Sequence, residues 1–241
     1  MGSVTSLAEN PFVVRDAPGW SVVFKPHGMP TAPLRDGEHG TLLAWFLALA
    51  PEAASVRGKK IVEHGLIHRL DTPTEGMVLI AKDQSAYDAL QESQNADLIR
   101  KTYRALCDHE RRAELERIVK GLPLSIESRF RPWGPGGREV RPVFPADRRY
   151  DGAGRDYRTV LESVEISEDE GVRCTCELTR GYRHQVRAHL ASLGLPIQGD
   201  DLYNRLHSEN DTGSKGILAL SAVGLSFPDP NSKATITIWL P

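Results

Sequence analysis

Apolar and polar residues alternate along the chain in short runs that predict more strands than helices. Strand-like runs cover residues 12–15, 20–24, 77–81, 101–107, 157–166, 172–178, 217–221 and 234–240. Helical spacing of apolar residues covers 41–50, 84–93, 113–119 and 183–193, and Gly194 and Pro196 end the last of these. Because the two element types intermix without a regular alternation, the pattern favours an α+β fold with a mixed, largely antiparallel central sheet and flanking helices.

One carboxylate stands at a distinctive point, where a loop leads into the apolar strand at 77–81. The segment reads His68-Arg69-Leu70-Asp71 and continues as Thr72-Pro73-Thr74-Glu75-Gly76. Loops held by a rigid element often carry catalytic residues, so Asp71 is a candidate catalytic acid. Taken alone, an Asp before Thr-Pro favours the interpretation as a simple turn, in which the side chain bonds to its own backbone.

Three further segments accompany this one. Taken in chain order, the four motifs resemble the motif set of the RluA-like pseudouridine synthases. The others are Lys25-Pro26-His27-Gly28, Lys101-Thr102-Tyr103 and Gly181-Tyr182-Arg183-His184-Gln185-Val186-Arg187. Residues 218–230 fit the last strand and turn of the family. The resemblance implies two α+β subdomains that share one sheet, with the active cleft between them. We expect one catalytic domain over residues 11–241, an N-terminal tail of residues 1–10 and no separate RNA-binding domain.

The resemblance also implies a reaction, the isomerisation of uridine to pseudouridine in rRNA or tRNA. The N-glycosidic bond breaks, the uracil rotates while bound, and C5 joins C1′ of the same ribose. No redox step or external group takes part, so we expect no cofactor and no metal. The uridine has to leave its stack, which implies base flipping. Asp71 is the expected catalytic residue, either as a nucleophile at C1′ or as a base at C2′.

Five residues are expected to bind the substrate on the same grounds. An enclosed carboxylate tends toward its neutral form, so Asp71 needs a cation beside it, and the guanidinium of Arg187 fits because it stays protonated. Tyr103 is expected to stack on the flipped uracil and Leu220 to line its pocket. Arg69 would take the place of the extruded base or pair with a phosphate, and Lys101 is expected near the cleft.

The net charge of −2 is unusual for an RNA enzyme, but the charge is unevenly distributed. Residues 129–158 hold eight arginines and four acidic residues, a balance of +4 that leaves the rest of the chain at −6. Aromatic residues lie between these arginines and could stack on unpaired bases, although for any single one of them covering the core is the more common role. We expect an RNA-binding hairpin with Arg131, Arg138 and Arg141. Arg180 and Arg183 are expected to bind a phosphate at the N-terminus of the helix at 183–193.

Four positions depart from the family pattern. Glu75 stands where Ser is usual, Tyr182 replaces an Arg, and Ser221 and Asp229 each replace a His. Asp71, Tyr103 and Arg187 are intact, so the departures bear on the choice of RNA more than on catalysis. A homologue that binds RNA without catalysis is the alternative hypothesis.

Other classes of protein are poorly supported. Three cysteines argue against a disulfide framework, and Cys174 and Cys176 alternate with polar residues as in a strand whose thiols face the core. The pairs His64 and His68, and His184 and His189, lack the Glu of a zinc-hydrolase motif. No Gly-rich loop joins a strand to a helix, so we expect no nucleotide cofactor. We also expect no membrane span or secretory signal, a cytoplasmic location and a monomer.

Overall fold

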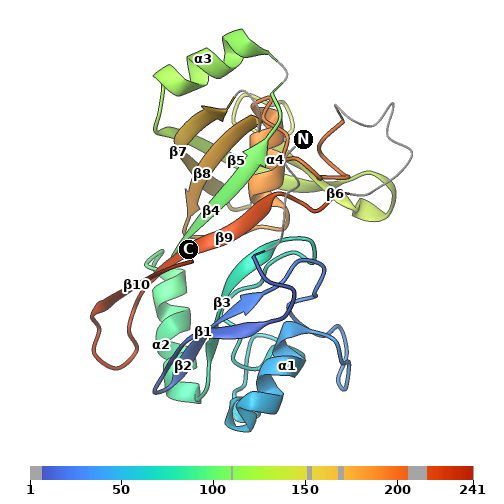
Figure 1. Cartoon of the computed structure of the whole chain (residues 1–241). Coiled ribbons are helices and arrows are strands. Elements are labelled where there is room, and N and C mark those ends of the chain that lie inside the picture. The colour runs from blue at the N-terminus through green and yellow to red at the C-terminus, as the bar shows by residue number, and fades with distance from the viewer. Residues whose placement is uncertain (1–6, 110, 151–153, 168–170, 206–215, 241) are drawn as a thin grey trace. The chain divides into compact units, whose positions relative to one another are not determined.

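The computed structural model describes residues 7–109, 111–150, 154–167, 171–205 and 216–240, which divide into two compact units (Figure 1). The N/C unit comprises residues 7–101 and 221–240, and the middle unit comprises the described residues between 102 and 220. The chain leaves the N/C unit within β4 (Arg100–Cys107) and returns to it within β9 (Leu220–Pro228). Each unit contains helices and a largely antiparallel sheet, which confirms the predicted α+β class.

The sheet of the N/C unit has the strand order β1-β2-β3-β9, and β10 also pairs with β9. Its strands are β1 (Phe12–Ala17), β2 (Trp20–Lys25), β3 (Glu75–Ala81), β9 and β10 (Thr235–Trp239). Neighbours pair antiparallel except β3 and β9, which run parallel. The helical elements are α1 (Leu42–Leu49), the 3₁₀ turns η1 (Pro51–Ser55) and η2 (Ile61–Glu63), and α2 (Gln84–Asn95).

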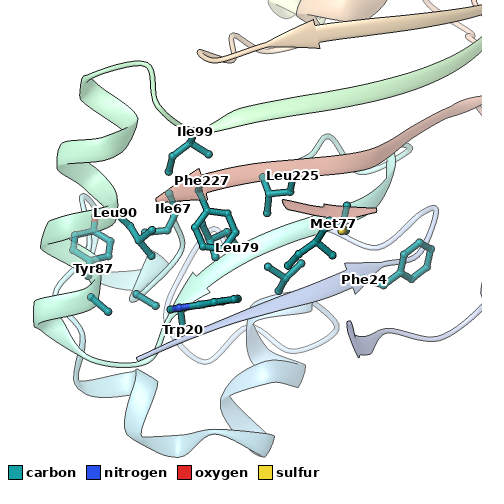
Figure 2. Close-up of a cluster of buried hydrophobic side chains, with 14 of the residues drawn as sticks. Trp20, Phe24, Ile67, Met77, Leu79, Tyr87, Leu90, Ile99, Leu225 and Phe227 are labelled. Atoms are coloured by element: carbon teal, nitrogen blue, oxygen red, sulfur yellow. The ribbon is translucent and has the colours of Figure 1, made fainter. Parts of the chain in front are cut away.

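The core of the N/C unit lies on one face of this sheet, against α2. Alternate residues of β2, β3 and β9, among them Trp20, Leu79 and Phe227, gather beside Tyr87 and Leu90 of α2 (Figure 2). The rings of Trp20 and Phe227 meet edge to face, with 4.9 Å between their centroids. Every residue of β2 and β3 is buried, including those that point to the opposite face. Burial on both faces explains why these strands have continuous apolar runs.

The middle unit contains a sheet of order β4-β8-β7-β5-β6 and two helices. Besides β4, its strands are β5 (Leu124–Trp133), β6 (Glu139–Val143), β7 (Tyr157–Ser167) and β8 (Gly171–Leu178). A 3₁₀ turn, η3 (Pro135–Gly137), joins β5 to β6, and the helices are α3 (Arg112–Lys120) and α4 (Gln185–Ser192). Cys174 and Cys176 of β8 are buried with free thiols, as their alternation predicted.

The predicted elements exist, and two of the differences in their extent have a clear physical cause. Helix α4 begins at Gln185 and not at 183, because His184 adopts a left-handed conformation (φ 58°) that helical residues do not have. The strand predicted at 217–221 begins at Leu220 and extends to Pro228, since buried Val223, Leu225 and Phe227 continue its apolar face past Gly224. Strands β5 and β6 form the hairpin expected in the Arg-rich segment.

Candidate active site

The loop that carries Asp71 is fixed on both sides of this residue. Before it, the hydroxyl of Thr31 donates to the carbonyl of Leu70 (2.7 Å) and accepts from its N–H (3.1 Å). After it, the N–H of Thr74 donates to the carbonyl of Asp71 (3.0 Å), which closes a tight turn. Asp71 itself is half-buried. The turn therefore presents a partly enclosed carboxylate on a rigid support.

Gly76 allows the strand after this loop to approach its neighbour. It has a φ of 125°, and a Cβ at this position would lie 2.4 Å from the carbonyl oxygen of Ala222. Gly76 and Ala222 are partners in the parallel pairing of β3 with β9. Only glycine satisfies both the backbone conformation and the close contact, which is a physical reason for the Gly of this motif.

Lys25 is a buried cation beneath the Asp71 loop. Its ammonium donates to the carbonyls of Pro26 (3.0 Å), Met29 (2.7 Å) and Thr72 (3.1 Å). Thr72 also accepts from the N–H of Gly28 (3.0 Å), so the Lys-Pro-x-Gly loop and the Asp71 loop are joined. Burial lowers the pKa of Lys25 to about 7, against the opposing effect of the charges of Asp71 and Glu75.

Lys25 is a residue that the sequence analysis missed as part of the site. It was named there only as the first residue of the Lys25-Pro26-His27-Gly28 motif, with no role of its own. The sequence did contain a sign of its role: Lys25 is the last residue of a mostly apolar strand, Trp20–Lys25. A charge at the end of a strand that is buried on both faces needs hydrogen-bond partners or an opposite charge, so it is a candidate for a structural or functional role.

The neighbours of Asp71 in its motif have different surroundings. Arg69 is about half exposed and pairs with Glu63, with 3.0 Å between Nη1 and Oε1. His68 accepts a hydrogen bond at Nε2 from the N–H of Leu79 (3.3 Å), which leaves its proton on Nδ1. Burial and the charge of Lys101 hold the pKa of His68 well below its usual value. His68 is thus a neutral support for β3, whereas Arg69 is open to a ligand.

Lys101 lies buried at the start of β4, in the N/C unit. Its ammonium donates to Oε1 of Gln94 (3.1 Å). Burial lowers its pKa to about 7, and the charge of Asp97 opposes this effect. Tyr103, two residues later, belongs to the middle unit and is buried on the same face as Ala105 and Cys107, as the alternation predicted.

Arg187 of α4 is held by a residue that the sequence analysis did not identify. Its Nε and Nη2 donate to the two carboxylate oxygens of Asp200, at 2.7 Å each, and both side chains are almost fully buried. Asp200 Oδ1 also accepts from the N–H groups of Leu202 (3.0 Å) and Tyr203 (3.1 Å). This bidentate pair fixes the plane of the guanidinium. The expected pairing of Arg187 with Asp71 involves both units and stays a prediction.

A buried polar network fastens α4 to the sheet. The ring of His189 bonds through Nε2 to the hydroxyl of Ser128 on β5 and through Nδ1 to that of Thr159 on β7, at 2.9 Å each. The side-chain amide of Gln185 donates to the same Thr159 hydroxyl (3.0 Å). Burial lowers the pKa of His189 to about 4, so the ring is neutral. The network orients the helix that carries Arg187.

The β5–β6 hairpin presents two arginines on one aromatic ring. Arg131 and Arg141 face each other across the strands, and their guanidiniums lie 4.9 Å and 3.7 Å from the centroid of Trp133. Among the described residues, no carboxylate forms an ion pair with either of them. Arg138, near the tip, is exposed. Two like charges in direct register are unfavourable, so this face is suited to an anionic ligand.

Of the two arginines predicted to bind a phosphate at the start of α4, Arg183 contacts the hairpin instead. Arg183 lies before the helix, and its guanidinium donates to the carbonyls of Gly137 and Glu139 (3.1 Å for the latter) at the hairpin tip. Arg180 is half-buried. The first turn of α4 is itself buried, because Gln185, Val186 and Arg187 are at most 5% exposed. A phosphate site there stays a prediction, and Arg183 already has a structural role.

The predicted uridine-binding residues therefore divide between the units. Asp71, Arg69 and Lys101 belong to the N/C unit, whereas Tyr103, Arg187 and Leu220 belong to the middle unit. Leu220 is 3% exposed, and its expected place in the uracil pocket stays a prediction. Within the described residues no three His, Cys, Asp or Glu side chains gather closely enough to hold a metal ion. Nor does this part of the chain contain a helix long and apolar enough to cross a membrane.

Residues 19–192 match the family model described as RNA pseudouridylate synthase, which covers more than half of the chain. The chain belongs to this family. The matched range contains Lys25, Asp71, Tyr103 and Arg187.

Several curated relatives of this chain are bacterial. An uncharacterized RNA pseudouridine synthase of Chloroflexus aurantiacus is 31% identical over 90% of this chain and 62% of the relative. One from Bacillus subtilis is 31% identical over 76% of this chain and 54% of the relative. The ribosomal large subunit pseudouridine synthase D of Nitrosomonas europaea is 28% identical over 90% and 58%. The chain thus spans somewhat more than half the length of these relatives.

A solved structure supports the same fold. Human RNA pseudouridylate synthase domain containing 1 superposes with a TM-score of 0.65 at 19% identity, covering 97% of this chain and 84% of the human one. A second human protein, RNA pseudouridylate synthase domain containing 4, gives a TM-score of 0.61 at 22% identity over 95% and 87%. The arrangement of elements described above is therefore the pseudouridylate synthase fold.

Proposed function

We propose that this protein is an RNA pseudouridine synthase and that Asp71 is its catalytic residue. The observation that carries the proposal is the construction of the Asp71 loop in a chain of this family. The loop is bonded on both sides of Asp71, is joined to a buried ammonium through Thr72, and presents a partly enclosed carboxylate. Such a fixed carboxylate serves a reaction that needs one ionised acid and no cofactor.

In the proposed reaction, Asp71 acts on the ribose of an extruded uridine. It attacks C1′ or removes the proton at C2′, and in either case the bond from C1′ to N1 breaks and the uracil leaves with the bonding electrons. The uracil then rotates, and C5 bonds to C1′. The hydrogen of C5 is lost to water and N1 gains a proton. The carboxylate is restored when it is released from C1′ in the first route, or when it returns its proton to C2′ in the second.

Tyr103, Leu220 and Arg187 would hold the uridine during these steps. The buried ring of Tyr103 supports stacking on the uracil, and Leu220 supports an apolar pocket wall. The Asp200 pair supports a role for Arg187 that needs a guanidinium of fixed orientation. Arg69, half exposed at the same loop, would occupy the space of the flipped base or bind a phosphate.

The RNA itself would be bound in part by the β5–β6 hairpin. Arg131 and Arg141 on Trp133, with Arg138 near the tip, supply cations for phosphates and a flat surface for an unpaired base. Several relatives carry the name of ribosomal large subunit synthases, which makes large-subunit rRNA the first substrate to test and transfer RNA the second. The cytoplasmic location and the monomeric state stay predictions.

The deciding experiment measures tritium release from RNA whose uridines are labelled at C5, because C5 loses its hydrogen only when the new bond forms. We expect release by the intact protein, none by Asp71→Asn, and normal release by Asp36→Asn. Asp36 is an exposed carboxylate of the same unit and is the matched control. Equal release by intact protein and Asp71→Asn would mean that another carboxylate is catalytic. No release from either, on rRNA and tRNA from cells lacking the protein, would favour a homologue that only binds RNA.

A further inference from the structure

A second group of cations lies in the N/C unit, on the segment that leads to the Asp71 loop. Residues 57–69 hold one acidic residue, Glu63, and four cations, namely Arg57, Lys59, Lys60 and Arg69. Their balance is +3, whereas the other described residues of this unit hold seven cations and twelve acidic residues. Positive charge is thus concentrated in one short segment of a unit that is otherwise acidic.

Two of these cations meet at one carboxylate oxygen. Nζ of Lys60 lies 3.5 Å and Nη1 of Arg69 lies 3.0 Å from Oε1 of Glu63. Lys60 and Arg69 are nine positions apart in the sequence, so the fold brings them together at Glu63. Glu63 carries a single charge and therefore compensates only one of the two cations.

The other two cations lie on either side of Gly58, whose backbone is packed against the residue after Glu63. A Cβ at Gly58 would lie 2.2 Å from the carbonyl oxygen of His64. The chain that carries Arg57 and Lys59 therefore runs directly beside the turn that carries Glu63. Arg57, Lys59, Lys60 and Arg69 together form the basic surface of the N/C unit.

The backbone of this segment is fastened to α2. The N–H of Arg57 donates to Oε1 of Gln84 (2.9 Å), and the N–H of Lys59 donates to the hydroxyl of the buried Tyr87 (2.9 Å). The side chains of Arg57 and Lys59 are exposed. The segment is therefore fixed by its backbone, while its cations remain available to a ligand.

The charges of the basic surface are only partly compensated within the fold. The side chains of Lys60 and Arg69 are 65% and 53% exposed, whereas that of Glu63 is 14% exposed. In the part of the chain that the structure describes, no carboxylate forms an ion pair with Arg57 or Lys59. Cations held close together by a fixed backbone repel one another, and a ligand with several negative charges relieves that repulsion.

We propose that the basic surface binds phosphates of the RNA strand that flanks the target uridine. Its position favours RNA over other polyanions, because Arg69 belongs to this surface and stands two residues before Asp71. A ligand bound there lies next to the proposed catalytic carboxylate. The inference gives the N/C unit an RNA contact of its own, besides the hairpin of the middle unit. It rests on the proposed function for the identity of the polyanion.

The test removes three charges of the basic surface in the intact chain, with Arg57→Gln, Lys59→Gln and Lys60→Gln combined. Arg69 is kept, since the proposed function already gives it a role at the flipped uridine. The matched control removes three exposed cations of the same unit outside residues 57–69, with Arg15→Gln, Arg35→Gln and Lys233→Gln combined. The probe is a short fluorescein-labelled single-stranded RNA that contains uridine, and its binding is followed by anisotropy over a range of salt concentrations.

Each phosphate contact with a single strand contributes about 0.7 to the slope of log affinity against log salt, so the triple variant should lose up to about 2 of this slope. At about 0.1 M salt its affinity should fall roughly 10-fold to 100-fold. The control should keep the slope of the intact protein. Glu63→Gln should bind the RNA more tightly than the intact protein, because it removes the acid that pairs with Lys60 and Arg69.

The kinetics of tritium release give a second readout. Phosphate contacts away from the reacting atoms stabilise the ground state and the transition state equally, so the triple variant should raise KM and leave kcat unchanged. A fall in kcat at unchanged KM would overturn the binding role of this surface.

The proposal is also overturned if the triple variant keeps the slope of the intact protein, if the control loses as much slope, or if Glu63→Gln binds the RNA no more tightly. Unchanged binding by the triple variant together with normal tritium release would count against the basic surface alone. If the intact protein binds the RNA but releases no tritium, the proposed function fails, and the comparison of slopes still decides whether the basic surface binds phosphates.

Discussion

The replacement Asp200→Asn tests how Arg187 is held. In the native protein the two side chains share two hydrogen bonds of 2.7 Å, with exposures of 2% and 0%. An Asn at 200 can still accept from the N–H groups of Leu202 and Tyr203 through Oδ1, so the turn that follows keeps its bonds. Its amide nitrogen, however, would face Nε of Arg187, donor against donor. The variant therefore removes the charge interaction and leaves the local backbone bonded.

Breaking a buried pair by removing one partner costs about 3–5 kcal/mol, because an uncompensated charge remains. The carboxylate of Asp201, 3.8 Å from Nη2 of Arg187 and about half exposed, compensates part of this charge. We therefore expect a loss at the low end, about 3 kcal/mol in the free energy of unfolding. The measurement is denaturant unfolding of the intact chain, followed by a signal from the middle unit.

The double variant Arg187→Met with Asp200→Asn gives the control. With neither charge present, it should be destabilised by less than the sum of the two single variants, with a coupling of at least about 2 kcal/mol. Additive losses, or a loss below about 1 kcal/mol for Asp200→Asn, would refute the idea that Asp200 is the residue that holds Arg187.

Three further predictions concern the hairpin, the strand after Asp71 and the buried histidine. Replacing Arg131, Arg138 and Arg141 together by Ala should weaken RNA binding and reduce the slope of log affinity against log salt by up to about 3; unchanged binding and slope in a filter assay would remove the hairpin from the interface. Gly76→Ala should destabilise the protein by at least about 2 kcal/mol in thermal or denaturant unfolding, because its Cβ would clash with the carbonyl of Ala222, and a neutral effect would contradict the geometry. His189, with a pKa of about 4 against an ordinary 6.5, binds its proton more readily in the unfolded chain, so stability falls as the pH drops from 6.5 to 4. His189→Gln should remove up to about 1.4 kcal/mol per pH unit of that slope, and an identical slope in the variant would show that another group titrates.

The apolar strands of the N/C unit could be predicted from the sequence because their signal is local. Strand β3 has a continuous apolar run, and α2 begins after Asp83, whose carboxylate accepts from the N–H of Ala86 (2.9 Å). Strand β5 was not predicted as a strand. Its ten residues include five polar side chains and Pro132, and its outer half is stabilised by pairing with β6, a partner that periodicity does not reveal.

The residues of the site could be predicted where they belong to one contiguous motif. They could not be predicted where the contact is made by a residue outside the motif. Asp71 could be singled out because its loop and strand are contiguous. Asp200 could not, because its relation to Arg187 depends on the turn after α4, which brings a residue 13 positions away against the guanidinium. The sequence shows only that a glycine, Gly199, precedes this acid. The structure explains that glycine, because it has a φ of 71° and a Cβ there would lie 2.1 Å from the carbonyl of Ile217.

The departures from the family pattern acquire a physical meaning once their partners are known. Glu75 bonds to Ser221, so two of the four changes complement each other. Asp229 accepts from Nε1 of Trp20 (3.1 Å) and from the N–H groups of the turn after β9, and these bonds lower its pKa. It thereby ties that turn to the buried core of the N/C unit.

Tyr182 remains, and its partner belongs to the hairpin. Its ring stacks on that of Phe130 with 5.0 Å between centroids and 8° between planes, and it lies 5.0 Å from the ring of Tyr157. Where the family has a cation before its His-Gln-x-Arg segment, this chain has a tyrosine that contacts Phe130 of β5. Relative to the family pattern, Tyr182 therefore removes a positive charge from the segment before α4. Its ring instead packs against Phe130 in the hairpin, whose arginines lie closer to the tip. If RNA affinity depends on those hairpin cations, it should change more when the charges of β5 and β6 are altered than when Tyr182 is replaced.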